Sequence, residues 1–344
     1  MSANNEAIER HDLRVTAVDG VGVAVREVRR VRPDPAAVPV VLVHGARVPG
    51  IGSFDLPVPG GSLAADLARA GHAAYLLDAR GYGGSDRPEA MSRPSDAGPP
   101  LVRAPEVVRD LAAVVGLARE RSGRSRVALL GWATGGMWAG LYATLWPETL
   151  SHLVLYNALY RSPVHPSLGA GSDLEDPGRP GTFNVAGVGA YRLNAAASLT
   201  AGWDRAIPLE DRATWRDPEV VSAYVAAALA SDPTSAERTP PSFRSPSGAL
   251  EDSFYQALGR QIWDASLVRT PTLVLASERD FWSQPADREA LREHLTHAHS
   301  VRVVVVPDAT HWVHLDRPER GRARFLAEVL AFLGDEPPAL YATS

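Results

Sequence analysis

Residues 127–136 read VALLGWATGG, an apolar run that passes directly into a glycine-rich turn. Val127 to Leu130 is continuously apolar, which is typical of a strand whose two faces are both buried in a sheet. A helix is predicted to follow, from about Gly135 to Trp146. The stretch therefore predicts a strand, a sharp turn and a helix, with Ala133 at the tip of the turn.

Strand-like and helix-like segments alternate along most of the remaining chain. A hairpin is predicted over Leu13 to Arg29, because Asp19-Gly20 supplies the positive φ angles of a tight turn. Buried strands are predicted at Val40 to Val43, Ala74 to Leu77, Leu153 to Tyr156, Thr272 to Leu275 and Val301 to Val306, and helices at Ser62 to Arg69, Glu106 to Arg119 and Arg320 to Leu333. This order predicts an α/β fold with a mostly parallel, doubly wound sheet.

One segment, residues 159–264, interrupts the alternation. It is rich in Pro, Gly and Ser, and only Pro218 to Ala230 has a clear helical pattern. A structureless loop of about a hundred residues is implausible inside a compact domain. We therefore expect a core formed by residues 1–158 and 265–344, and an inserted cap subdomain over residues 159–264 that covers the active site.

Composition narrows the classes of partner. The 344 residues carry a formal net charge of −5, which lacks the basic excess that nucleic-acid binding needs. There is no cysteine, and the first residues, MSANNEAIERHDL, lack the apolar run of a secretory signal. We expect a cytoplasmic protein that acts on a small molecule, without a nucleic-acid or membrane partner. These features leave the oligomeric state open.

The turn at residues 131–136 has the spacing of the Gly-x-Ser-x-Gly nucleophile elbow, except that Ala133 occupies the position of the serine. Small residues are needed beside the tip because the flanking backbone segments nearly touch. In such sites two backbone N–H groups stabilise the oxyanion, one after the nucleophile and one after the first buried strand. These donors are predicted to be Thr134 and Ala46.

An acid and a base follow the last two predicted strands. Asp280 comes shortly after Thr272 to Leu275, and His311 comes directly after Val301 to Val306. A serine hydroxyl needs an imidazole to take its proton, and the imidazole needs a carboxylate that fixes its tautomer. We therefore predict Asp280 and His311 as the acid and the base, with Glu278 and His314 as their rivals.

Together these residues resemble the α/β-hydrolase superfamily over nearly the whole chain. His44-Gly45 resembles its oxyanion turn, and residues 78–88, DARGYGGSDRP, resemble its Asp-x-Arg-Gly-x-Gly-x-Ser segment. The elbow, the Asp280 turn and the His311 loop complete the likeness. The resemblance implies an α/β-hydrolase fold and two-step hydrolysis through an acyl-enzyme, without a metal or an organic cofactor.

Ala133 departs from that pattern, because an alanine side chain has no atom that can attack a carbonyl carbon. Either a serine has been replaced deliberately to trap a substrate, or this is a natural homologue that has lost catalysis. The first explanation is favoured, since a non-catalytic protein would have no chemical reason to keep Asp280, His311 and the glycines.

Aromatic residues suit a pocket for a ring or an alkyl chain, although most of those in the cap are expected to hold it together. Candidates for substrate contact are Trp132, Tyr156, Trp203 and Arg47. Arg47 could pair with an anionic group, or it could be a solvated loop residue. The stretch from Arg47 to Pro57 resembles esterases that act on monoalkyl phthalates.

The predicted function is hydrolysis of a small aryl or alkyl carboxylic ester, which includes a monoalkyl phthalate. Hydrolysis of a carbon–carbon bond, a lactone or an amide is the first alternative, because the motifs would be the same. A ligand-binding homologue without turnover is the second.

Overall fold

The computed structural model describes residues 7–161, 165 and 167–335. Residues 1–6 and 336–344, at the two ends of the predicted core, lie outside the described residues. So do residues 162–164 and 166 of the predicted cap. No helix in the described ranges combines the length and the apolar character that crossing a bilayer requires.

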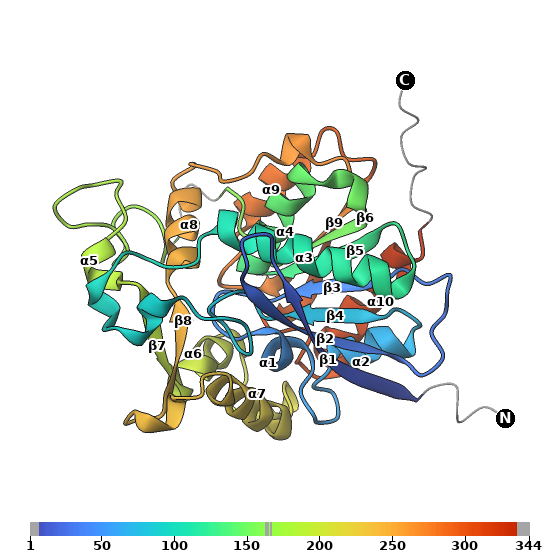
Figure 1. Ribbon diagram of the computed structural model, residues 1–344, viewed down its shortest axis with the longest axis horizontal. Coiled ribbons are helices and arrows are strands. Elements are labelled where there is room, and N and C mark those ends of the chain that lie inside the picture. The colour runs from blue at the N-terminus through green and yellow to red at the C-terminus, as the bar shows by residue number, and fades with distance from the viewer. Residues whose placement is uncertain (1–6, 162–164, 166, 336–344) are drawn as a thin grey trace.

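An eight-stranded sheet forms the centre of the molecule (Figure 1), in the order β1-β2-β4-β3-β5-β6-β9-β10. Strands β1 and β2 form the predicted hairpin, and β2 pairs antiparallel with β4. All the other neighbours are parallel. The strands are β1 Ile8–Thr16, β2 Gly22–Arg30, β3 Val40–Val43, β4 Ala74–Leu77, β5 Val127–Trp132, β6 Leu150–Tyr156, β9 Thr272–Arg279 and β10 Val301–Thr310. The prediction of a mostly parallel α/β sheet is confirmed.

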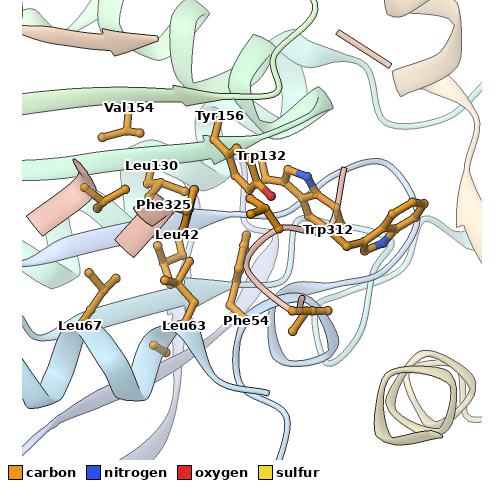
Figure 2. Close-up of a cluster of buried hydrophobic side chains, with 14 of the residues drawn as sticks. Leu42, Phe54, Leu63, Leu67, Leu130, Trp132, Val154, Tyr156, Trp312 and Phe325 are labelled. Carbon is orange, nitrogen blue, oxygen red and sulfur yellow. The ribbon is translucent and has the colours of Figure 1, made fainter. Parts of the chain in front are cut away.

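Helices cover both faces of this sheet. Alternate strand residues point to opposite faces, and both sets are apolar, so each face needs a covering layer. In β3, Val41 and Val43 belong to one buried cluster, and Val40 and Leu42 belong to the other. Figure 2 shows part of the cluster that contains Val40 and Leu42. This cluster also includes side chains from α1, α2 and α10. The helices around the sheet are α1 Gly50–Phe54, α2 Leu63–Arg69, α3 Ala104–Ser122, α4 Thr134–Leu145, α9 Pro285–His294 and α10 Arg322–Leu333. Of these, α1 and α9 were not predicted, because α1 has only five residues and α9 is mostly polar.

The segment predicted as a cap has more regular structure than its sequence indicated. Helix α7 has the predicted bounds Pro218–Ala230. Two strands, β7 Tyr191–Ala195 and β8 Ser242–Pro246, form a separate antiparallel pair. Further helices are α5 Val185–Val188, α6 Ala196–Ala206 and α8 Gly248–Ala257. These elements lie to one side of the main sheet in Figure 1, whereas the division at residues 159 and 264 stays a prediction.

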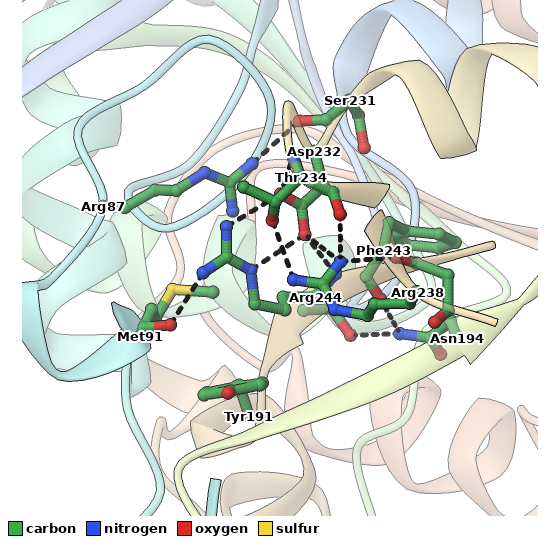
Figure 3. Close-up of polar contacts among 12 residues, drawn as sticks. Arg87, Met91, Tyr191, Asn194, Ser231, Asp232, Thr234, Arg238, Phe243 and Arg244 are labelled. Carbon is green, nitrogen blue, oxygen red and sulfur yellow. Dashed lines mark hydrogen bonds and ion pairs between the residues drawn. The ribbon is translucent and has the colours of Figure 1, made fainter. Parts of the chain in front are cut away.

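A buried carboxylate ties this segment to the loop after β4 (Figure 3). Asp232, just after α7, accepts hydrogen bonds from Arg244 Nε at 2.9 Å and Arg244 Nη2 at 2.8 Å. Arg244 Nη1 then donates to the Met91 carbonyl oxygen at 2.7 Å. Arg87 donates to the Ser231 carbonyl oxygen at 2.7 Å. The end of α7, strand β8 and the loop after β4 are therefore linked by charged groups.

Gly135 in the elbow has no room for an added carbon atom, which gives a test of the fold. A Cβ at Gly135 would collide with the carbonyl oxygens of Val43 and His44. We expect Gly135→Ala to lower the free energy of unfolding by about 3 kcal/mol, because backbone must move. The matched control is Gly116→Ala in the exposed middle of α3, where a Cβ meets no atom within 4 Å. It should raise that free energy by about 1 kcal/mol. Urea unfolding of both variants measures the difference, and equal stabilities would contradict the close approach.

Candidate active site

The turn between β5 and α4 holds Ala133 in an unusual backbone conformation. Its φ of 53° and ψ of −119° lie in a region that residues with a Cβ rarely adopt. Its N–H donates to the Tyr156 carbonyl oxygen at 2.9 Å, and its own carbonyl oxygen accepts from the Gly136 N–H at 3.0 Å. Such conformations cost about 1–3 kcal/mol and persist only where their surroundings impose them. The tip of the elbow is therefore strained and fixed.

Asp280 and His311 meet as predicted. The His311 Nδ1–H donates to Asp280 Oδ1 at 2.6 Å, and the two side chains are 7% and 1% exposed. The carboxylate also accepts from the Trp282 N–H at 3.0 Å and from the Ser283 N–H at 2.9 Å. These bonds fix the carboxylate, so the proton of the neutral imidazole stays on Nδ1. The other ring nitrogen, Nε2, does not contact Asp280 and can accept a proton. This is the tautomer that a general base needs.

The backbone carbonyl of His311 is held as firmly as its ring. It accepts hydrogen bonds from Trp132 Nε1 at 3.1 Å, Tyr156 Oη at 3.0 Å and Asn157 Nδ2 at 3.2 Å. Asn157 also accepts from the Ser277 N–H through Oδ1 at 2.7 Å. The ends of β5, β6 and β9 are thus tied to the histidine loop. Asn157 could not be predicted as part of the site, because a single asparagine after a strand carries no recognisable pattern.

The two predicted oxyanion donors line one cavity with Ala133 and His311. Thr134 is the first residue of α4, so its N–H has no partner within the helix and lies at the positive end of the helix dipole. The peptide carbonyl of Ala46 accepts from Tyr82 Oη at 3.2 Å and from Arg192 Nη2 at 3.1 Å. These bonds fix the loop that carries the Ala46 N–H.

His44 and Asp78 also hold the loop after β3 that carries Ala46. The His44 Nδ1–H donates to the Gly45 carbonyl oxygen at 2.6 Å, and Nε2 accepts from the Ala79 N–H at 3.1 Å. Burial lowers the pKa of His44, which keeps the ring neutral as this arrangement requires. Asp78 accepts from the N–H groups of Gly50 and Gly84, each at 2.9 Å. The two motifs after β3 and β4 therefore position the predicted oxyanion donor.

The cavity has a volume of about 210 Å³, below the range of about 300–1,000 Å³ that is usual for pockets holding drug-sized ligands. Of the predicted substrate-binding residues, Arg47 and Trp132 line it. Tyr156 and Trp203 are fully buried and lie outside its lining. Tyr156 supports the His311 loop, and the Trp203 ring stacks on Trp312 with centroids 5.3 Å apart. The other lining residues are Gly45, Val48, Arg192, Tyr224, Leu250, Phe281, Trp282 and Trp312.

Glu278 and His314, the alternatives to Asp280 and His311 in the sequence, lie in other environments. Glu278 is exposed and accepts from the Asp308 N–H at 2.7 Å. His314 is fully buried, and its Nε2 donates to the Ser53 carbonyl oxygen at 3.0 Å. Within the described residues, no group of three His, Asp or Glu side chains could hold a metal ion.

His314 should make the protein sensitive to acid. Burial lowers its pKa to about 3, so the unfolded chain binds a proton at this residue between about pH 6.5 and 3 that the folded chain does not. Stability is therefore lost as the pH falls through this window. We expect His314→Gln, whose amide can still donate to Ser53, to reduce the slope of unfolding free energy against pH by up to about 1.4 kcal/mol per unit. Urea unfolding at pH 7 and 5 measures the slope, and an unchanged slope would mean that His314 is protonated in the folded protein.

The sequence matches the model of the alpha/beta hydrolase fold family over residues 38–318. A search of curated proteins found no match. Solved structures of similar fold include a thermophilic esterase from Thermogutta terrifontis with malate bound, at 19% identity and a TM-score of 0.57 over 94% of this chain and 98% of that one. An esterase from Exiguobacterium antarcticum has 17% identity and a TM-score of 0.57, over 94% of this chain and 100% of that one.

A third similar structure is a serine-to-alanine mutant of meta-cleavage product hydrolase from Pseudomonas fluorescens IP01, complexed with acetates. It has 18% identity and a TM-score of 0.58, over 93% of this chain and 96% of that one. At these identities the structural likeness concerns the fold alone. The family match spans most of the sequence and includes the elbow, Asp280 and His311. The chain therefore belongs to the alpha/beta hydrolase fold family.

Proposed function

We propose that this chain carries the active site of a serine hydrolase of carboxylic esters, in a form that Ala133 makes inactive. The observation that carries the proposal is the strained elbow at Ala133, in one cavity with a His311 that is hydrogen-bonded to Asp280. A strained backbone at a position that now has no reactive atom is best explained by a serine that once occupied it.

With serine at position 133, each described group has a step to perform. His311 Nε2 takes the hydroxyl proton as Oγ attacks the ester carbonyl carbon, and the N–H groups of Ala46 and Thr134 stabilise the oxyanion. The protonated imidazole then gives its proton to the leaving alcohol, and an acyl-enzyme remains. Water, activated by the same imidazole, attacks the acyl-enzyme and releases the acid. Asp280 stabilises the imidazolium in both steps.

The size of the cavity supports a small substrate. About 210 Å³ with aromatic walls accommodates a ring or a short acyl chain, and a long alkyl group would have to extend out of the cavity. A small aryl or alkyl ester fits these limits, and monoalkyl phthalates remain within the proposed class. We also propose that residues 159–264 act as the cap over this cavity and that the protein is cytoplasmic.

Restoring the nucleophile tests the proposal. We expect Ala133→Ser to hydrolyse p-nitrophenyl acetate with a kcat/KM at least about 10³-fold above that of the Ala133 chain, because the triad is then complete. Activity should fall as the acyl chain lengthens. Release of p-nitrophenol at pH 7 gives the rates, and mass spectrometry should detect the acyl-enzyme.

The control is a second substitution in the restored protein. Adding His311→Ala should remove the gain, whereas adding His299→Ala, an exposed histidine outside the cavity, should leave it unchanged. A folded Ala133→Ser protein that is inert on every ester would contradict the proposal. Turnover of a lactone, an amide or a carbon–carbon bond in place of esters would assign another chemistry to the same residues. Ligand binding without any turnover would indicate a receptor.

A further inference from the structure

A buried carboxyl group with no part in the proposed mechanism lies in the loop that follows His311. Asp316 is 2% exposed. Its Oδ1 accepts from Trp203 Nε1 at 2.8 Å, and its Oδ2 accepts from Thr310 Oγ1 at 2.7 Å and from the Thr310 N–H at 3.3 Å. Thr310 is the last residue of β10, whereas Trp203 lies on α6 in the predicted cap. One side chain therefore joins the predicted core to the predicted cap.

Burying this carboxyl group is costly. Burial raises the pKa of Asp316 to about 7, although its hydrogen-bond donors oppose the rise. The buried carboxylates of Asp110 and Asp252 are compensated differently, since each forms an ion pair with an arginine. Arg216 interacts electrostatically with Asp316, but its ion pair is with Asp204. Ionisable groups in such environments cluster at functional sites, which points to a role for Asp316 besides packing.

The Thr310 hydroxyl transmits the contact with Asp316 to both neighbours of His311. Because its hydrogen is donated to Asp316, its oxygen is free to accept, and the Trp312 N–H donates to it at 3.2 Å. Thr310 directly precedes His311, and Trp312 directly follows it. The backbone on either side of the proposed base is therefore held through one hydroxyl group, whose orientation is set by Asp316.

Two aromatic rings close this chain of contacts. The Trp203 ring stacks on Trp312, with centroids 5.3 Å apart and an interplanar angle of 15°. Trp312 also lines the cavity, and its ring centroid lies 5.0 Å from that of His311. A closed ring of contacts beside His311 is therefore formed by Asp316, Thr310, Trp312 and Trp203.

We infer that Asp316 is a positioning residue, which holds the backbone around His311 against Trp203, so that docking of the predicted cap keeps the proposed base in place. The other hydrogen bonds to His311, through its ring and its carbonyl oxygen, come from the predicted core. Asp316 adds a restraint that depends on the predicted cap. This inference rests on the proposed function for the role of His311 as a base, but the restraint itself can be measured without turnover.

The Ala133 chain allows the restraint to be tested by proton NMR. The Nδ1–H of His311, which is hydrogen-bonded to a carboxylate, should give a far-downfield resonance that is identified by its loss in His311→Ala. We expect Thr310→Val to speed exchange of this proton with water at least about tenfold, because valine keeps the shape of threonine but cannot make the two hydrogen bonds of the hydroxyl. Thr310→Ser, which keeps the hydroxyl, should restore slow exchange.

Trp203→Phe tests the end of the contact that lies in the predicted cap. It keeps a ring that can stack on Trp312 but removes the N–H that donates to Asp316, so we expect faster exchange of the same proton. The matched control is Thr149→Val, at a buried threonine outside the cavity whose hydroxyl donates to the Trp146 carbonyl oxygen at 2.8 Å. It should lower the free energy of unfolding and leave the exchange rate unchanged.

Kinetics of the Ala133→Ser protein separate this inference from the proposed function. We expect Thr310→Val to lower its kcat at least about tenfold and to change KM less than about twofold, because a displaced base affects the chemical step. A Thr310→Val protein that is less stable but keeps slow exchange and full kcat would overturn the inference, and so would Trp203→Phe without an effect on exchange. An Ala133→Ser protein without activity refutes the hydrolase alone, since the exchange rates still decide the role of Asp316.

Discussion

The contact between the β5–α4 turn and the loop after β3 determines the geometry of the candidate site. Gly135 packs directly against the carbonyl oxygens of Val43 and His44, where no side chain could fit. This contact places Thr134 and Ala46, whose N–H groups come from segments nearly ninety residues apart, in the lining of one cavity. The strain at Ala133 is a consequence of the same contact, because the chain must turn sharply to enter α4.

Two sets of hydrogen bonds from the predicted core fix His311, the proposed base. Asp280 holds the ring of His311 through Nδ1, while Trp132, Tyr156 and Asn157 hold its backbone carbonyl. Such preorganisation matters because a catalytic group that is displaced by about 1 Å can lose much of its effect. The predicted cap contributes Arg192, Tyr224 and Leu250 to the walls of the cavity, whereas Asp280 and His311 are held by the predicted core.

Local patterns were sufficient to predict the main strands, the elbow and the pairing of Asp280 with His311. In a parallel sheet these residues follow strand ends that meet at one edge, so their order along the chain predicts their proximity. Arg192 could not be predicted, because it lies in a short strand of a region without clear periodicity. Tyr156 and Trp203 were assigned to the substrate, but aromatic residues of the same kind are used to support His311 and Trp312. Sequence does not distinguish these roles, since both require a large side chain near the site.

The hydrogen bond from Arg192 to the Ala46 carbonyl oxygen joins β7, in the segment proposed as a cap, to the loop that carries the proposed oxyanion donor. Lid segments of enzymes commonly move to admit substrate, whereas an oxyanion donor must stay in place. Any outward movement of β7 would break this bond and release one restraint on the Ala46 peptide. The machinery would then be fully assembled only while the entrance is closed. Ligand would then enter while the cavity is open, and the site would be ready for catalysis only after it closes. Water that enters the open cavity would meet an incomplete oxyanion hole.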